Sequence, residues 1–245
     1  MAAVKKLDDL QVESFDTDYV SGARWNAVKA RIDKDFPGGY FNFLDVGGGN
    51  GVFADTLLET YPSARGTILD NSEVLLSRNK PNPRKTLVQE SVENLGVITG
   101  KFDLVCVHWL LHHLVGTSYS ETRHHQLSAL SGIAAFLNDR GRISLFENVC
   151  NGWLIDNLPG WLIYHITSAK TIAAITRRMG ANTAGVGVCY LSKNEWFSTI
   201  RVSRLDVLQY SEPDPWVWPI RPEWRAFLHV RNIRVGHFWL RAADA

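Results

Sequence analysis

Short apolar runs alternate with amphipathic stretches along the first 150 residues of the chain. The apolar runs predict buried strands, and the fourth of them is apolar on both faces, as a central parallel strand is. The amphipathic stretches predict helices. The predicted strands cover residues 40–46, 65–70, 85–90, 102–109 and 140–149, and the predicted helices cover 16–36, 51–61, 71–79 and 118–139. This alternation predicts an α/β fold with a doubly wound, mostly parallel sheet.

The rest of the chain follows a different pattern. Residues 150–190 have no strand pattern and predict a helical insert after the fifth strand. A serine-capped helix is expected at 191–200, and two further strands at 204–210 and 233–241, which a parallel sheet can accept at its edge. Without an internal repeat or a shift in composition, residues 1–245 are interpreted as a single domain, with an N-terminal helical segment at 1–40.

Composition narrows the classes of partner. The 245 residues carry a net charge of +1, so no basic field indicates a nucleic-acid partner. No apolar stretch is long enough to span a membrane, and residues 1–15 have no apolar core of signal-peptide length. Three cysteines without metal-ligand spacing indicate a reduced, cytoplasmic setting and no metal site.

A glycine cluster follows the first predicted strand, in the stretch FLDVGGGNGVFA. Gly47, Gly49 and Gly51 come two, four and six residues after Asp45, and Asp70 ends the next strand. Ligands of open α/β sheets bind at the carboxyl ends of the strands, and a carboxylate at this distance suits the hydroxyls of a ribose. A dinucleotide fingerprint can also be aligned with Gly49, Gly51 and Ala54, so the glycines alone do not choose between nucleotide classes.

Five segments in order resemble the motifs of the class I S-adenosylmethionine-dependent methyltransferases, over roughly residues 15–148. They are FLDVGGGNGVFA, ILDNSEVL, VQESVENL, FDLVCVHWLLHHL and LNDRGRISLFENV. The resemblance implies a Rossmann-like sheet of seven strands, the last of them antiparallel, and S-adenosylmethionine as the cofactor.

The resemblance also implies cofactor-binding roles for the matched positions. Asp45 would orient the glycine loop or meet the methionine amino group, and Asp70 would hold the ribose. Tyr19 and Arg24 would reach the methionine carboxylate, unless they are ordinary surface residues. The remaining cofactor contacts implied are Gly47, Gly49 and Gly51 along the nucleoside and methionine, Asn71 and Glu90 at the adenine, and the main chain of Ser91 and Val92 at the ring edge.

Histidines gather where the fourth strand ends. His108 ends the strand, and His112 lies four residues beyond it, so both are predicted to face the reaction and are candidates for a catalytic base. Trp109 is interpreted as a wall of the substrate pocket or a core residue. Glu147, at the end of the fifth strand, is interpreted as a substrate contact or a structural hydrogen-bond acceptor.

Aromatic residues of the insert predict a lid over the methyl acceptor. Trp153, Trp161 and His165 are eight and four residues apart and would share one face of a helix. The alternatives are a packed core and a homodimer surface.

These observations together predict a methyltransferase that acts on a small, apolar or aromatic molecule of specialised (natural-product) metabolism. Oxygen is the favoured acceptor atom, followed by nitrogen and carbon. One alternative is an S-adenosylmethionine-binding enzyme that catalyses a cyclisation or rearrangement. Others are a cofactor-sensing regulator without catalysis and a nicotinamide oxidoreductase.

Overall fold

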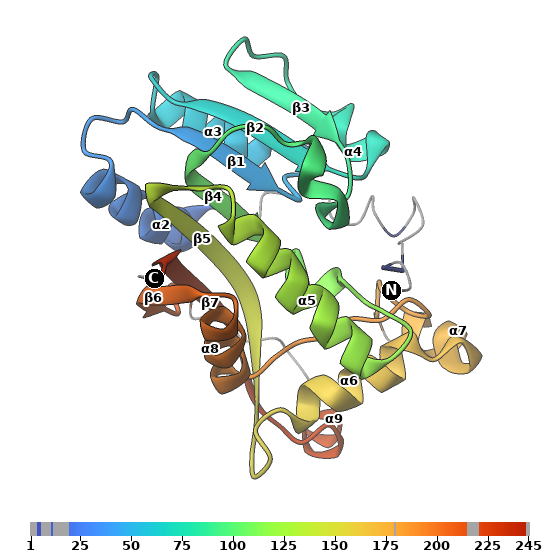
Figure 1. Ribbon diagram of the computed structural model, residues 1–245. Coiled ribbons are helices and arrows are strands. Elements are labelled where there is room, and N and C mark those ends of the chain that lie inside the picture. The colour runs from blue at the N-terminus through green and yellow to red at the C-terminus, as the bar shows by residue number, and fades with distance from the viewer. Residues whose placement is uncertain (1–3, 6–10, 12–19, 179, 215–220, 244–245) are drawn as a thin grey trace.

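The strands of the chain form one twisted sheet at the centre of the molecule (Figure 1). The computed structural model describes residues 4–5, 11, 20–178, 180–214 and 221–243. Within these residues the sheet has seven strands, in the order β3-β2-β1-β4-β5-β7-β6. The strands are β1 (Asn42–Val46), β2 (Arg65–Asp70), β3 (Lys85–Gln89), β4 (Phe102–His108), β5 (Leu137–Gly152), β6 (Leu205–Ser211) and β7 (Val230–Ala242).

The direction of the strands confirms the predicted fold class. Strands β1 to β5 pair in parallel, whereas β7 runs antiparallel to both of its neighbours, β5 and β6. Chain order reverses between β1 and β4, and the crevice above that point is where open α/β sheets bind their ligands.

Helices cover both faces of the sheet (Figure 1). On one face α2 and α3 bury residues such as Ile32 and Leu57 against β1, β2 and β4. On the other face α5 and α8 bury Leu130 and Trp196 against β4, β5 and β7. The helices outside the insert are α2 (Gly22–Asp35), α3 (Val52–Thr60), α4 (Glu73–Leu76), α5 (Tyr119–Ala134), α8 (Lys193–Val202) and α9 (Pro222–Phe227), with 3-10 turns η1 (Val92–Val97) and η2 (Leu111–His113).

Strand β5 is longer than the sequence predicts. It begins at Leu137 instead of residue 140 because β4 pairs with it from Phe102 onward, although Asn138, Asp139 and Arg140 are polar. It continues to Gly152, which pairs with Val230 of β7. Pairing with a distant strand therefore extends β5 beyond its apolar run.

The insert folds as the helices α6 (Leu158–Ser168), η3 (Lys170–Ile172) and α7 (Ala173–Arg178). The chain then returns to the end of the sheet, where Cys150 donates a backbone hydrogen bond to Leu191 and Cys189 donates one to His112 (2.8 and 2.9 Å). A small core of Cys150, Val188, Tyr190, Val230 and Ile233 holds this return beside β5 and β7. The insert thus brings Tyr190 next to the end of β4.

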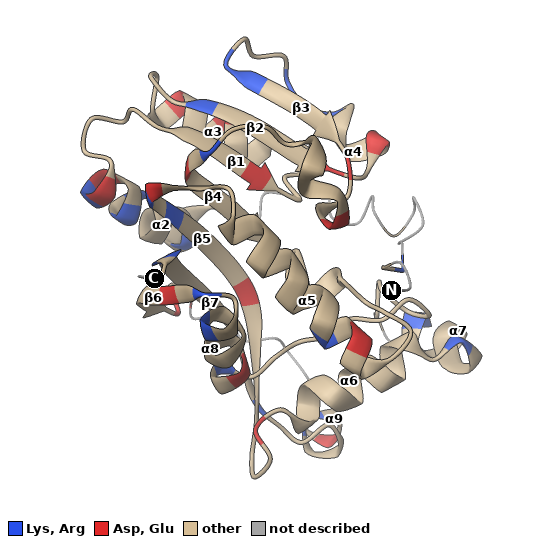
Figure 2. Cartoon of the chain, in the orientation of Figure 1, with Lys and Arg blue, Asp and Glu red and all other residues tan. Residues whose placement is uncertain are grey.

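Charged residues of both signs are distributed over the elements of the chain (Figure 2). The described helices include none that is both long and apolar enough to cross a membrane. The three cysteines are reduced and buried.

Candidate active site

A cavity of about 710 Å³ opens above the carboxyl ends of the parallel strands. Its walls come from segments far apart in the sequence, because parallel strands end at the same edge of the sheet. Residues that line it include Arg24 from α2, Asp45 from β1, Asp70 from β2, His108 from β4, His112 from η2, Asn148 from β5, Tyr190 from the insert and Val235 from β7.

The glycine loop after β1 forms one side of the cavity. Gly49 donates its backbone N–H to Oδ2 of Asp70 (2.9 Å), which ties the loop to β2. Gly51 has a φ of +74° and precedes α3, and a Cβ at this position would overlap the side-chain oxygen of Asn79. Gly47 and Gly49 line the cavity. Gly51 is not among the lining residues, so its part is to turn the chain into α3.

Asp45 lies under this loop, with only 2% of its surface exposed. Its Oδ2 atom has no hydrogen-bond partner among the described residues, and a Cβ on Gly48 would lie 2.6 Å from it. The pKa of Asp45 is raised to about 7, mainly by burial and also by the charge of Asp70, while Lys85 acts in the opposite direction. A buried carboxylate oxygen without a partner, in the wall of a cavity, is suited to a cationic group of a ligand.

Asp70 and Glu90 follow on the next two strands. Oδ1 of Asp70 accepts from the backbone N–H of Ser72 (2.8 Å), which fixes the carboxylate at the cavity wall. Burial raises the pKa of Asp70, while backbone N–H groups of Ser72 and Gly49 oppose the shift. Glu90 accepts from Ser91 N–H (2.8 Å) and from Asn94 (3.0 Å). Asn71, Ser91 and Val92 complete this side of the cavity.

His112 and Glu147 form a buried pair. Nδ1 of His112 lies 2.6 Å from Oε2 of Glu147, and Oε1 of Glu147 accepts from the backbone N–H of Leu111 (2.8 Å). Both carboxylate oxygens therefore hold η2. His112 lines the cavity, whereas Glu147 is fully buried behind it and does not. With Nδ1 donating to Glu147, Nε2 is the nitrogen of His112 that is able to accept a proton.

His108 is in a different environment. Its ring lies among those of Phe53 and Phe146, with centroid distances of 4.6 and 5.1 Å, and its Nε2 atom is 3.0 Å from the hydroxyl of Ser144. The pKa of His108 is lowered to about 3, mainly by burial and also by His237. A ring that is this difficult to protonate is a weak proton acceptor at neutral pH.

Trp109 forms a fixed wall beside His108. Its φ is +52°, a strained value for a bulky residue. Its backbone N–H donates to Phe146 (2.9 Å), its ring stacks on that of Phe146 at 5.2 Å, and Nε1 donates to Asn148 (3.3 Å). The guanidinium of Arg24 lies 5.1 Å from the ring and pairs with Asp214 (2.7 Å). These contacts hold both Trp109 and Arg24 at the cavity.

Residues 43–131 match the family model of a methyltransferase domain. Over these residues the chain is similar to methyltransferase domains. This match covers about a third of the chain, and the sheet order described above extends the fold beyond it. No curated protein is significantly similar to the chain in sequence.

Solved structures of methyltransferases share the fold of this chain at low sequence identity. A candidate sarcosine dimethylglycine methyltransferase from Galdieria sulphuraria is 14% identical, with a TM-score of 0.56 over 91% of this chain and 85% of its own. The mitomycin 7-O-methyltransferase MmcR is 18% identical (TM-score 0.54, 90% of this chain). The N,N-8-amino-8-demethyl-D-riboflavin dimethyltransferase RosA from Streptomyces davawensis is 15% identical (TM-score 0.53, 90% of this chain). The chain spans 56% of the length of each of the last two.

The fold brings most of the predicted cofactor residues to one cavity. Arg24, Asp45, Gly47, Gly49, Asp70, Asn71, Glu90, Ser91 and Val92 all line it. Tyr19 lies outside the described residues. The predicted catalytic residues His108 and His112 and the predicted wall Trp109 also line it.

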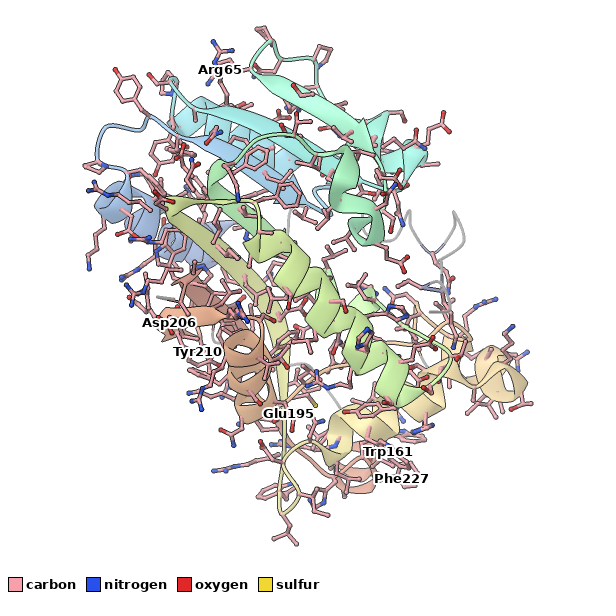
Figure 3. The ribbon with its side chains drawn as sticks, in the orientation of Figure 1. Arg65, Trp161, Glu195, Asp206, Tyr210 and Phe227 are labelled. Atoms are coloured by element: carbon pink, nitrogen blue, oxygen red, sulfur yellow. The ribbon has the colours of Figure 1, made fainter. Side chains whose placement is uncertain are left out.

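The insert residues are placed differently from the prediction. Trp153, Trp161 and His165 are not among the residues that line the cavity. Trp161, labelled in Figure 3, is 43% exposed and packs on His165 at 4.3 Å, so these two residues share a face of α6 that points outward. Trp153 precedes α6 and is not part of that face. Helix α6 instead buries Gly160, Tyr164 and Thr167, because Gly160 lets the helix approach the backbone of Tyr190 closely.

Glu147 likewise reaches no substrate, because it is enclosed behind His112. Asn148 and Tyr190 line the cavity and were not predicted. Asn148 follows Glu147 at the end of β5, so its place on the edge could have been found from the strand pattern. Tyr190 is brought in by the return of the insert, which no local pattern shows. Among the described residues, no three His, Cys, Asp or Glu side chains gather as a metal site would require.

Proposed function

We propose that the methyltransferase domain binds S-adenosylmethionine and transfers its methyl group to a hydroxyl oxygen of a small, apolar or aromatic molecule. The observation that carries the proposal is the pair His112–Glu147, with its 2.6 Å hydrogen bond in the wall of a cavity whose other end carries Asp45 and Asp70. The pair supplies a proton acceptor, and the two aspartates supply the polar contacts that the cofactor needs.

The residues present fit this cofactor. Asp70, fixed by two backbone N–H groups, would accept hydrogen bonds from the ribose hydroxyls. Asp45, whose Oδ2 has no partner among the described residues, would accept from the cationic amino group of the methionine part. Glu90, Asn71, Ser91 and Val92 would surround the adenine. Arg24 would be the cation for the methionine carboxylate, in competition with Asp214.

When bound, the cofactor would supply a methyl group on a positively charged sulfur, and that sulfur would leave as a neutral thioether when the acceptor oxygen attacks the methyl carbon in line. Nε2 of His112 would take the proton of the acceptor hydroxyl. Glu147 holds the ring in the tautomer that leaves Nε2 bare and stabilises the charge that develops on it. Trp109 fixes the wall beside it.

The size and lining of the cavity support a small acceptor. Its volume of about 710 Å³ falls within the range of small-molecule sites. Oxygen is favoured over nitrogen because an amine reacts as its neutral form and does not need a base during the transfer, whereas a hydroxyl benefits from one. Two structures with this fold, MmcR and RosA, are named for small acceptors, a mitomycin and a riboflavin derivative.

Incubation with S-adenosylmethionine and a panel of phenols, followed by mass spectrometry, tests the proposal. The expected result is a product heavier by one methylene group together with one equivalent of S-adenosylhomocysteine. A product with the mass of its substrate and unconsumed S-adenosylmethionine would instead indicate a cyclisation or rearrangement. Binding of S-adenosylhomocysteine by calorimetry tests the cofactor separately.

A further inference from the structure

Three polar side chains on three neighbouring strands form a hydrogen-bonded row behind the cavity. Nε2 of His108 on β4 lies 3.0 Å from Oγ of Ser144 on β5, and Oγ of Ser144 lies 3.1 Å from Nε2 of His237 on β7. Ser144 and His237 are buried, whereas His108 is half-buried and lines the cavity. The row thus leads from the cavity into the sheet, and methyl transfer by His112 makes no use of it.

The single hydroxyl proton of Ser144 couples the tautomer of His108 to that of His237. A serine hydroxyl donates one hydrogen bond, and a neutral histidine carries its proton on either Nδ1 or Nε2. Two bare Nε2 atoms would compete for the single proton of Ser144, and two Nε2–H groups would leave that proton without an acceptor. Both hydrogen bonds form and the hydroxyl proton keeps an acceptor only when one ring donates to Ser144 and the other accepts from it. The two rings are therefore expected to hold opposite tautomers.

The surroundings keep both rings neutral. Burial lowers the pKa of His108 and of His237 to about 3, and the positive charge of Arg31 contributes to the shift at His237. The ring of Phe146 stacks on that of His237 at 4.3 Å. Among the described residues no carboxylate hydrogen-bonds to either ring, in contrast to His112 and its partner Glu147.

The position of the row indicates the part of the ligand that it meets. Under the proposed function, the cofactor occupies the side of the cavity over β1, β2 and β3, with Asp45, Asp70 and Glu90. His108 lies on the other side, with Trp109, Asn148 and Val235 from β4, β5 and β7. That side remains for the methyl acceptor. It combines the apolar surfaces of Trp109 and Val235 with the polar atoms of His108 and Asn148, so a flat ring with a polar atom at one edge fits it.

We propose that Ser144 couples the tautomers of His108 and His237, so that Nδ1 of His108 presents either an N–H donor or a bare nitrogen to the methyl acceptor. This inference rests on the proposed function only for the identity of the ligand. His108 is then a specificity-determining residue, and Ser144 and His237 are positioning residues that act through it.

The two states of the row contain the same number of protons. In the donor state, His108 carries its proton on Nδ1, Ser144 donates to His108, and His237 Nε2–H donates to Ser144. In the acceptor state, His108 Nε2–H donates to Ser144, Ser144 donates to His237, and His237 carries its proton on Nδ1. The change moves one proton along each hydrogen bond. Nδ1 of His108 gives its proton to water in the cavity, and Nδ1 of His237 takes one from water, so that the number of protons in the row does not change.

Nitrogen-15 NMR of histidine-labelled protein measures the tautomers directly. In the free wild-type protein we expect both rings to be neutral at pH 7, one protonated on Nδ1 and the other on Nε2. His237→Phe keeps a ring stacked on Phe146 and leaves Ser144 free to donate to His108, so it should hold His108 in the Nδ1–H form. Ser203→Ala, at another buried serine, which caps the carboxyl end of α8, is the matched control and should change neither ring.

Two flat probes, added with saturating S-adenosylhomocysteine, test the link to ligand binding. 1-Naphthol donates a hydrogen bond and should draw His108 to the acceptor state, whereas quinoline only accepts one and should draw it to the donor state. His237 should change in the opposite sense each time in the wild type but not in Ser144→Ala. His237→Phe should weaken 1-naphthol binding about fivefold, as loss of one hydrogen bond would, and leave quinoline binding unchanged.

The outcomes separate this proposal from the proposed function. Equal tautomers on both rings of the free protein, or a positively charged ring at pH 7, would overturn the coupling. If His108 holds the same tautomer with both probes, or if neither probe at saturation changes its tautomer, then His108 does not determine which acceptor binds. If S-adenosylhomocysteine does not bind while the free rings hold opposite tautomers, the cofactor proposal fails and the coupling stands.

Discussion

Nδ1 of His112 in η2 lies 2.6 Å from Oε2 of Glu147 in β5, and both side chains are buried. The second oxygen of Glu147 holds the backbone of η2 through Leu111. A single carboxylate thus fixes the ring of His112 and the turn that carries it. In contrast, the ring of His108, at the end of β4, has the neutral hydroxyl of Ser144 as its hydrogen-bond partner among the described residues.

The first prediction concerns this pair. His112→Gln should lower kcat with a phenolic acceptor by roughly 10²–10⁴-fold, because the general base is lost. S-adenosylhomocysteine affinity should not change. His124→Gln, at an exposed position of α5, is the control and should keep full activity. A rate for His112→Gln within a few-fold of wild type would show that the base lies elsewhere.

Asp70 provides a prediction about the cofactor. Asp70→Asn removes the charge from the hydrogen bonds to the ribose and should weaken S-adenosylhomocysteine binding by about 1.5–3 kcal/mol in calorimetry. The asparagine oxygen still accepts from one of the backbone N–H groups that Asp70 holds, so the variant should fold. Asp139→Asn, at an exposed position of β5, should bind normally. Equal affinity of the two variants would remove Asp70 from the cofactor site.

The raised pKa of Asp45 predicts that the stability of the protein depends on pH. Its pKa is raised from 3.8 in the unfolded chain to about 7 in the fold, so the folded state binds more protons between these values. The contribution of Asp45 to stability is therefore present below pH 4 and is lost as pH rises toward 7, by at most about 1.4 kcal/mol per pH unit. Urea unfolding of wild type and Asp45→Asn between pH 4.5 and 7.5 isolates this term. A constant difference between the two proteins would contradict it.

The same titration should appear in ligand binding. Asp45 must be ionised to pair with the cationic amino group of S-adenosylhomocysteine, so the affinity of wild type should rise as pH increases through about 7. Asp45→Asn should bind more weakly at pH 8 and show little dependence on pH. If the affinity of both proteins changes with pH in the same way, the amino group of S-adenosylhomocysteine does not pair with Asp45.

The sequence predicts the sheet and the cofactor side of the cavity well, for a physical reason. Parallel strands are buried runs with sharp ends, and residues at those ends meet at one edge; β2 therefore matches its prediction at 65–70, and Asp70 lies where expected. The partners of the histidines could not be predicted in this way. Ser144 and His237 meet His108 only through the pairing of β4, β5 and β7.

In the insert, the pattern of apolar residues fails to predict which face of the helix is buried. Helix α6 has apolar residues on several sides, so hydrophobicity does not select its buried face. Small residues select it, because Gly160 permits a close approach that a larger side chain would block. The aromatic pair Trp161 and His165 is left on the outer side as a consequence.

This placement leads to a prediction with an internal comparison. Trp161→Ala should change stability by less than about 1 kcal/mol and leave the KM of a phenolic acceptor unchanged, because the ring is 43% exposed and lies outside the cavity lining. Tyr164→Ala on the same helix should cost about 3–5 kcal/mol, since Tyr164 is only 2% exposed. A strong rise in KM for Trp161→Ala would support the predicted lid over the acceptor. A change of oligomeric state, measured by light scattering, would make Trp161 part of an interface.

The glycine loop allows a last comparison, between backbone strain and overlap. Gly51 and Gly100 have φ of +74° and +87°, but a Cβ on Gly100 would meet no atom within 4 Å, whereas one on Gly51 would overlap the side chain of Asn79. Gly100→Ala should therefore lower the free energy of unfolding by about 1–2 kcal/mol, from backbone strain alone. Gly51→Ala should lose more, and should also weaken S-adenosylhomocysteine binding, because Asn79 donates to the carbonyl of Gly49 (2.8 Å) and would have to move. Adding Asn79→Ala to Gly51→Ala should restore the stability that Gly51→Ala loses through overlap with Asn79. The stability lost through backbone strain should not return. Equal losses for Gly51→Ala and Gly100→Ala in urea unfolding would show that Asn79 moves aside at no cost.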